Sequence, residues 1–251
     1  MAGQVALSQA LSYARDLKAL YEASQARERD LATTNDRLCA AYQQSLCYAA
    51  DLKKTYRQLE RSVLQSLLGL ANALEAKDPY TRGHSERVAR SARRLALAVG
   101  LPPGSAETIA HAGLLHDLGK IAVPEAILRK PAPLTEEEWR VMRQHPLTGA
   151  QIVSPLECFE EEAVIIRHHH ERPDGSGYPD GLGADRIPLG ARIVAIADMY
   201  DALASDRPYR RRLPQGDVVR CLREAAGRTL DGRLTTAFLA LISDGSPEPG
   251  L

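Results

Sequence analysis

The chain has 251 residues, enough for one large domain or for one ordinary domain with an extension. Hydrophobic residues make up 44% and charged residues 25%, a composition typical of globular proteins that bury a core. Lys plus Arg and Asp plus Glu both number 32, so the formal net charge is zero. This balance argues against binding to DNA or to anionic membranes through bulk positive charge.

The N-terminal residues lack a basic segment followed by an apolar stretch, so no signal peptide is expected. No apolar run approaches the ~20 residues needed to span a bilayer. The four cysteines form no C-x-x-C pair, which argues against a zinc ribbon or a thioredoxin-type site. We therefore expect a cytoplasmic protein without a disulfide framework.

The first predicted element is one long helix, because residues 9–76 contain no proline and a single glycine. From Leu17 to Leu70, steps of four and three residues place apolar side chains at eleven of sixteen positions. Glu28 and Asn35 interrupt this heptad seam. Two interpretations stay open: a parallel coiled-coil dimer, favoured by the length of the pattern, or a single amphipathic helix packed on its own domain. We assign residues 1–73 to this segment.

Residues 74–242 are predicted to form a second, all-α domain, because helical periodicity recurs between Gly and Pro breaks and no period-2 strand pattern appears. A capping box is expected at Thr135 and Glu138, and Ser105 is a candidate helix cap. Residues 243–251 are predicted to be a disordered tail. Helices are expected over residues 85–99, from 105 to about 116, from 217 to about 226, and from 230 to about 243. Further helices are expected to begin after residue 135, at Pro146 and at Pro188, and the last of these is expected to end at residue 204.

All seven histidines lie between His84 and His170, and carboxylates lie among them. Imidazole suits Fe, Mn, Zn and related ions, and a carboxylate can bridge two ions. Two divalent ions ~3.5–4 Å apart can clamp a phosphoryl group and lower the pKa of a bridging water. This combination of residue types therefore indicates a site for phosphoryl chemistry.

The spacing of the histidines indicates helix ends. Adjacent residues on a regular helix point ~100° apart, so the pairs His116-Asp117 and His169-His170 converge best where a helix stops. Gly119 places a break after the first pair.

Taken singly, most of these residues have ordinary structural interpretations, such as a hydrogen bond at a helix end or a cap before Pro146. Asp198 is the exception, because a carboxylate in an otherwise apolar helix must be paired or bound to metal. His111 has no carboxylate close to it in the sequence and is interpreted as a structural or surface histidine.

In combination, the segments resemble the HD-GYP family, the HD-superfamily phosphodiesterases associated with cyclic di-GMP. The resemblance covers about residues 74–212. The matching segments follow the family's order and spacing: Asp78–Ser85, His116–Lys120, His145-Pro146, His169–Glu171, Gly177–Pro179, and Ala197-Asp198 with Ser205–Arg210.

The resemblance implies an HD-superfamily helical domain with two divalent metal ions. Fe or Mn are the expected ions, with Ni, Co or Zn as alternatives. One ion would be held by His84, His116, Asp117 and Asp198, and Asp117 would bridge to a second ion held by His145, His169 and His170. Some members hold a third ion with a glutamate four residues before the first histidine, where this chain has Tyr80, so two ions are expected.

The resemblance also implies a mechanism. A hydroxide between the ions would attack phosphorus as the ribose 3′-oxygen departs, with Asp117 and Lys120 as the catalytic residues. Lys120 would stabilise charge on the phosphate, and Tyr178, Arg207 and Arg210 would contact the substrate. Family members open cyclic di-GMP to linear pGpG, and some continue to GMP.

Three alternatives remain: a catalytically silent cyclic-dinucleotide sensor or scaffold, an HD phosphohydrolase for another nucleotide, and a structural coiled-coil protein. Pro173 departs from the aromatic residue or Asn that many members carry and can reshape the pocket lip. The expected partners are the cyclic di-GMP substrate, a second copy of the chain through the N-terminal helix, and a regulatory signalling protein.

Overall fold

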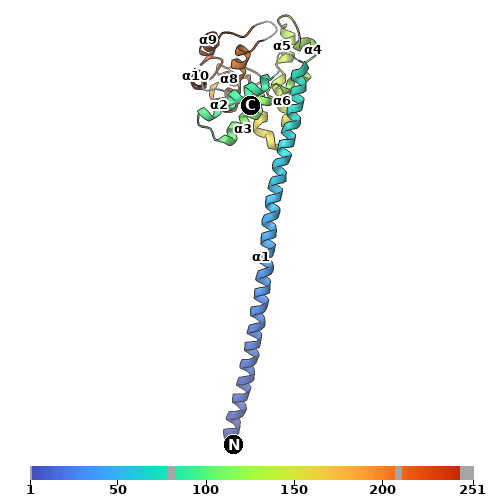
Figure 1. The fold of residues 1–251 in the computed structure, drawn as a ribbon, viewed down its shortest axis with the longest axis vertical. Helices are drawn as coiled ribbons and strands as arrows, with labels where there is room; N and C mark the ends of the chain where they lie inside the picture. Colours follow the sequence, from blue (N-terminus) through green and yellow to red (C-terminus); the bar gives the residue numbers. More distant parts are fainter. Residues whose placement is uncertain (1, 78–82, 207–210, 244–251) are drawn as a thin grey trace. The chain divides into compact units, whose positions relative to one another are not determined.

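The described residues of the computed structural model, 2–77, 83–206 and 211–243, are helical and contain no β-strand, only two isolated bridges. The all-α prediction is therefore confirmed (Figure 1). The chain divides into two compact units, residues 1–62 and 63–251. The α-helices are α1 (Ala2–Lys77), α2 (His84–Ala98), α3 (Pro103–Leu115), α4 (Glu125–Leu128), α5 (Glu136–Met142), α6 (His145–Val153), α7 (Glu160–His168), α8 (Leu189–Ala204), α9 (Gln215–Ala225) and α10 (Gly232–Ser243).

The first unit consists of the N-terminal part of α1, and the last turns of this helix belong to the second unit. Along the first unit the apolar side chains are exposed, for example Leu17 at 70%, Leu38 at 67% and Leu52 at 72%. Among the described residues, no helix is both long enough and apolar enough to cross a bilayer. The predicted domain boundary at residue 73 and the division after residue 62 both lie within α1.

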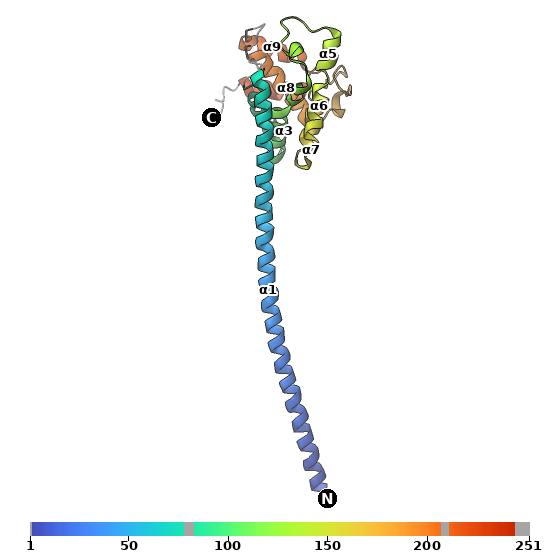
Figure 2. The ribbon, with the colours of Figure 1, turned by 90° about the vertical axis from the view of Figure 1, so that its right-hand side faces the viewer.

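The core of the second unit is built around α2, α3 and α8, with Leu67 and Ala71 of α1 packed into it. Val88 and Leu95 of α2 and Ile193 of α8 are fully buried. Burial of such apolar side chains is the main stabilising contribution to a domain of this kind. Helices α6 and α7 lie side by side at the edge of this core (Figure 2).

Several predicted boundaries are corrected by the structure. Helix α3 begins at Pro103 after the extended Pro102, so Ser105 is not a cap; proline suits a first turn because its missing N–H would be unpaired there. Pro188 precedes α8 as its N-cap residue, whereas Pro146 occupies the first turn of α6 as predicted. The capping box of Thr135 and Glu138 is confirmed.

The chain also contains four short elements that the periodicity did not predict: α4 and the 3-10 helices η1 (Leu118–Ala122), η2 (Glu157–Phe159) and η3 (Ala184–Arg186). Segments of three to five residues are too short to show a helical repeat. Arg207, Arg210 and residues 78–82, including Tyr80, lie outside the described residues. The same is true of the predicted tail, except that Ser243 is the last residue of α10.

Candidate metal centre

The predicted histidine ligands lie at helix ends, whereas the predicted ligand Asp198 lies within α8. His84 and His145 are the first residues of α2 and α6, and His116 and His169 directly follow α3 and α7. At these positions the backbone leaves the regular helical path, so neighbouring side chains can turn in the same direction. The interpretation of the histidine spacing as a set of helix ends is therefore confirmed.

Two motif glycines allow close backbone contacts at the site. A Cβ atom on Gly119 would overlap the carbonyl oxygen of His145, which allows the segment after Asp117 to lie directly against α6. A Cβ atom on Gly177 would overlap the backbone of Arg172 and lie 2.6 Å from the carbonyl oxygen of His170. Any side chain at either position would push the ligand-bearing segments apart.

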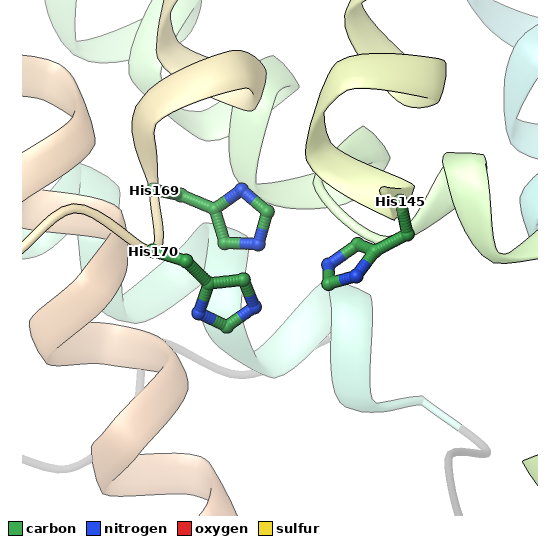
Figure 3. Close-up of side chains that lie close together, drawn as sticks. All are labelled: His145, His169 and His170. Carbon is green, nitrogen blue, oxygen red and sulfur yellow. The ribbon is translucent and has the colours of Figure 1, made fainter. Parts of the chain in front are cut away.

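Three overlapping groups of side chains have the composition and spacing of metal ligands, with candidate ligand atoms within 4.8 Å of one another in each. Figure 3 shows the all-imidazole group, in which rings from α6 and from the end of α7 face a common centre. The third group shares one histidine with each of the other two. The groups are His145, His169 and His170; His84, His116 and Asp198; and His116, Asp117 and His169.

Asp117 lies between the two main groups. Its Oδ1 atom is 3.5 Å from Nε2 of His145, and its Oδ2 atom is 3.5 Å from Nε2 of His116. One carboxylate oxygen therefore faces each group, which is the geometry that a bridging carboxylate requires.

The buried histidines are oriented by backbone carbonyls. The Nδ1 atoms of His116, His145 and His169 each donate to the carbonyl oxygen three residues earlier, at 2.7 to 2.8 Å. A neutral ring with its proton on Nδ1 keeps its lone pair on Nε2. All three Nε2 atoms are buried without a hydrogen-bond partner. Buried polar atoms rarely lack partners, so this donor set fits metal ions at the common centre.

His84 is oriented differently, by a side chain. Its Nδ1 atom donates to Asp201 at 2.7 Å, and its Nε2 atom lies 3.3 Å from Asp198. Asp201 is 4% exposed and also accepts from Nε of Arg87 at 2.6 Å. A carboxylate behind a metal-binding histidine fixes the ring and raises its basicity. This role of Asp201 was not predicted from the sequence; its position three residues after Asp198 on one helix is the available clue.

The two main groups differ in their electrostatics. Burial lowers the pKa of His145 to about 4 and that of His170 to about 3. Burial alone would also lower the pKa of His84, but the hydrogen bonds to Asp198 and Asp201 overcome it and raise the value to about 9. Burial opposes ionisation of Asp117, yet Lys120 and the nearby histidines hold its pKa well below the usual range.

A cleft of about 340 Å³ opens over these ligands. Lys120 and Tyr178 line it, together with Trp139. The Nζ atom of Lys120 lies 2.5 Å from Oδ2 of Asp117, an ion pair that the sequence analysis did not predict. The Tyr178 ring stacks on His170 with centroids 4.9 Å apart, and burial raises the pKa of its hydroxyl. The hydroxyl therefore keeps its proton at neutral pH.

Two glutamates without a predicted role hold the segments around the site. Glu171 is 3% exposed and accepts from the backbone N–H groups of Asp180 and Leu182, which fixes the loop that carries Tyr178. Glu75, near the end of α1, accepts from Gly83 N, Ser85 N and Ser85 Oγ at 2.6 to 3.0 Å. Its carboxylate thus binds the backbone on both sides of His84.

The sequence is similar to a known family and to proteins of known activity. A model of the HD domain family matches residues 69–234. The chain is 40% identical over 199 residues to the cyclic di-GMP phosphodiesterase response regulator RpfG of Xanthomonas campestris, covering 78% of this chain and 53% of the relative. It is 38% identical to the 3′3′-cGAMP-specific phosphodiesterase 2 of Vibrio cholerae, covering 75% of this chain and 35% of the relative. The chain thus spans about half or less of the length of these relatives.

Solved structures show the same fold. A crystal structure of a cyclic GMP-AMP specific phosphodiesterase from V. cholerae matches with a TM-score of 0.57 at 15% identity, over 72% of this chain and 49% of the other. An HD-GYP-like protein from Bdellovibrio bacteriovorus matches with a TM-score of 0.52 at 21% identity, over 64% of this chain and 51% of the other. Together with the family match, which spans more than half of the sequence, these findings establish that the chain belongs to the HD domain family, as its HD-GYP motifs predicted.

Proposed function

We propose that this chain is a metal-dependent phosphodiesterase that hydrolyses cyclic di-GMP to pGpG. One observation carries the proposal: three buried Nε2 atoms without hydrogen-bond partners converge beside Asp117, whose two oxygens face separate ligand groups. The proposed ligands are His84, His116, Asp117, His145, His169, His170 and Asp198, around two divalent ions of which Fe and Mn are the first candidates. Two such ions would supply Lewis acidity and lower the pKa of a water molecule.

The chain's own residues would bind and orient the substrate. The Lys120 ammonium lies in the cleft beside Asp117, where it can donate a hydrogen bond to an anionic phosphate oxygen as a second partner. Tyr178 keeps its proton and can donate a hydrogen bond to the same substrate. Arg207 and Arg210 stay proposed substrate contacts on the strength of the family motif, and they lie outside the described residues.

The names of the relatives support this substrate class. RpfG and PA4108 of Pseudomonas aeruginosa are named cyclic di-GMP phosphodiesterases, at 40% and 39% identity. Three relatives from V. cholerae are named 3′3′-cGAMP-specific phosphodiesterases, at 38 to 40% identity. 3′3′-cGAMP is therefore the second candidate substrate.

Anaerobic purification, metal analysis and a hydrolysis assay that follows pGpG and GMP test the proposal. We expect about two bound ions per chain and release of pGpG, with 3′3′-cGAMP assayed in parallel. Clearly fewer than about two ions per chain after anaerobic reconstitution would contradict the two-ion centre. Tight binding of cyclic di-GMP without turnover by the metal-loaded protein would instead assign the chain to the silent sensors.

We also propose that the N-terminal helix pairs with a second copy of the chain as a parallel coiled coil. A helix of 76 residues is roughly 110 Å long, far more than one domain of about 190 residues can cover. Seam side chains such as Leu38, Tyr42 and Leu52 are exposed by 65 to 72%. Long isolated helices gain most of their stability by burying such a stripe against a partner.

Light scattering on seam variants tests the dimer. We expect Leu38→Asp with Leu52→Asp to give a monomer, because both charges would enter the buried seam. Leu46→Asp is the matched control: Leu46 is also exposed, at 54%, but lies outside the seam. A seam variant that remains dimeric would place the interface elsewhere.

We propose that a signal from a regulatory partner reaches the centre through α1, because the Glu75 carboxylate binds the backbone on both sides of His84. A Glu75→Ala variant is expected to weaken metal binding, and unchanged metal affinity would contradict this path. The cytoplasmic location stays a prediction.

A further inference from the structure

A second cavity, of about 430 Å³, adjoins the cleft over the predicted ligands. The two cavities share Trp139, His170 and Tyr178, whereas Arg143 and Arg172 line the second cavity but not the cleft. Its volume falls within the ~300–1,000 Å³ that is typical of small-molecule sites. We call this second cavity the arginine pocket.

The two arginines of the pocket differ from their neighbours in their partners. Arg140 lies 3.9 Å from Glu137, and Arg167 forms a 2.8 Å ion pair with Asp180. Within the part of the chain that the structure describes, neither Arg143 nor Arg172 pairs with a carboxylate. Arg172 reaches the Ser176 hydroxyl at 3.5 Å, and its charge contributes to the lowered pKa of Asp174 without forming an ion pair. Both guanidinium groups therefore keep forked donors available to a ligand.

Aromatic rings provide flat surfaces in the same pocket. Trp139 is 39% exposed, unusually open for a tryptophan, and the Arg143 guanidinium lies 5.8 Å from the centre of its ring. Tyr178 also lines both cavities and stacks on the proposed ligand His170. A planar ligand in the pocket would thus meet aromatic faces and arginine forks beside the proposed metal ligand His170.

We propose that the arginine pocket binds the guanine base of a nucleotide next to the scissile phosphate, and that Arg143 and Arg172 determine the preference for guanine. This inference rests on the function proposed above. Guanine presents two adjacent acceptors, O6 and N7, which match the two parallel N–H donors of an arginine. Adenine presents an N–H donor in place of O6, so one arm of the fork would face another donor and lose its hydrogen bond.

The test compares the full chain carrying Arg143→Gln together with Arg172→Gln against the unchanged protein. Equilibrium binding of cyclic di-GMP and cyclic di-AMP is measured in chelator, where no turnover occurs, and initial rates with both are measured after metal loading. Arg140→Gln is the matched control, because Arg140 is an exposed arginine of the same helical segment and lines neither cavity. Circular dichroism checks that all variants fold.

We expect the unchanged protein to bind cyclic di-GMP more tightly than cyclic di-AMP. In the double variant the ratio of the two affinities should fall by about 5- to 150-fold, as one good forked base contact predicts. The control variant should keep this ratio. An unchanged preference in the double variant would overturn the inference. An equal loss of affinity for cyclic di-GMP and cyclic di-AMP is one such result, because the arginines would then bind phosphate. If the unchanged protein hydrolyses neither ligand, the proposed function itself fails.

Discussion

The two ligand groups of the candidate centre are built from different chemistry. The group of His145, His169 and His170 consists of imidazoles whose pKa values are lowered by burial, so the rings are neutral at neutral pH. The group around His84 contains Asp198 and is supported by Asp201, and these carboxylates keep His84 protonated in the metal-free protein.

The supports of the two groups differ as well. Backbone carbonyls orient His145 and His169, so no single substitution can remove that support. A side chain, Asp201, orients His84 and can be removed by mutation. His116 of the His84 group is also oriented by a backbone carbonyl, so the difference lies at His84: this ligand depends on a network of charges, whereas His116, His145 and His169 are oriented by the fold itself.

The largest expected effect comes from the residue that joins the two halves. Asp117→Ala should remove both ions, because the carboxylate that faces both groups is lost. Loss of an outer-shell partner typically costs 10- to 100-fold, so loss of a shared ligand should cost more than about 100-fold in activity. Metal analysis with the hydrolysis assay measures this. Retention of one ion per chain would show that the halves bind independently.

Lys120 adds positive charge beside one of the two ligand groups, because its Nζ atom binds the Asp117 oxygen that faces His116. Lys120→Ala should keep the metal and lower kcat by about 100- to 1,000-fold, comparable to the loss of one donor to a developing anion. Lys130→Ala is the control, since Lys130 pairs with Glu138. Unchanged kcat in Lys120→Ala would remove this residue from the mechanism.

Local sequence could predict that the pairs His116-Asp117 and His169-His170 lie at helix ends, because each pair precedes helix-breaking residues. The full set of ligands came from the resemblance to the HD-GYP family. Asp201 and Arg143 could not be assigned in this way. Their roles depend on how α8 meets α2, and on which cavity the end of α5 lines, and both follow from long-range packing rather than from spacing along the chain.

Asp201→Asn should weaken metal binding at the His84 group alone. The amide keeps the shape of the side chain but removes the negative charge that makes the His84 ring more basic, so we expect about 10- to 100-fold lower affinity for one ion. Titration of the metal-free protein with Mn²⁺ should then show one weakened and one unchanged site. Equal weakening of both sites would contradict the separation of the two halves.

The smallest effect is a difference in pH dependence of the metal-free protein. The folded pKa of His84 is raised to about 9, so its stabilising contribution is complete below its ordinary value of 6.5 and is lost as the pH rises through 9. The folded pKa of His145 is lowered to about 4, so the neutral ring stabilises the fold above 6.5 and this contribution is lost as the pH falls toward 4. The free energy of unfolding should fall by about 2 kcal/mol between pH 7 and pH 9 because of His84. It should fall by about 2 kcal/mol between pH 8 and pH 5 because of His145.

Urea unfolding in chelator at pH 5, 7 and 9 measures both contributions, and each variant serves as the control for the other. His84→Gln should flatten the loss of stability above pH 7, because the group whose raised pKa causes that loss is removed. His145→Gln should flatten the acid side only. If both variants changed the same side of the profile, the two groups would share one electrostatic environment, and the contrast between His145, oriented by the backbone, and His84, oriented by charge, would fail.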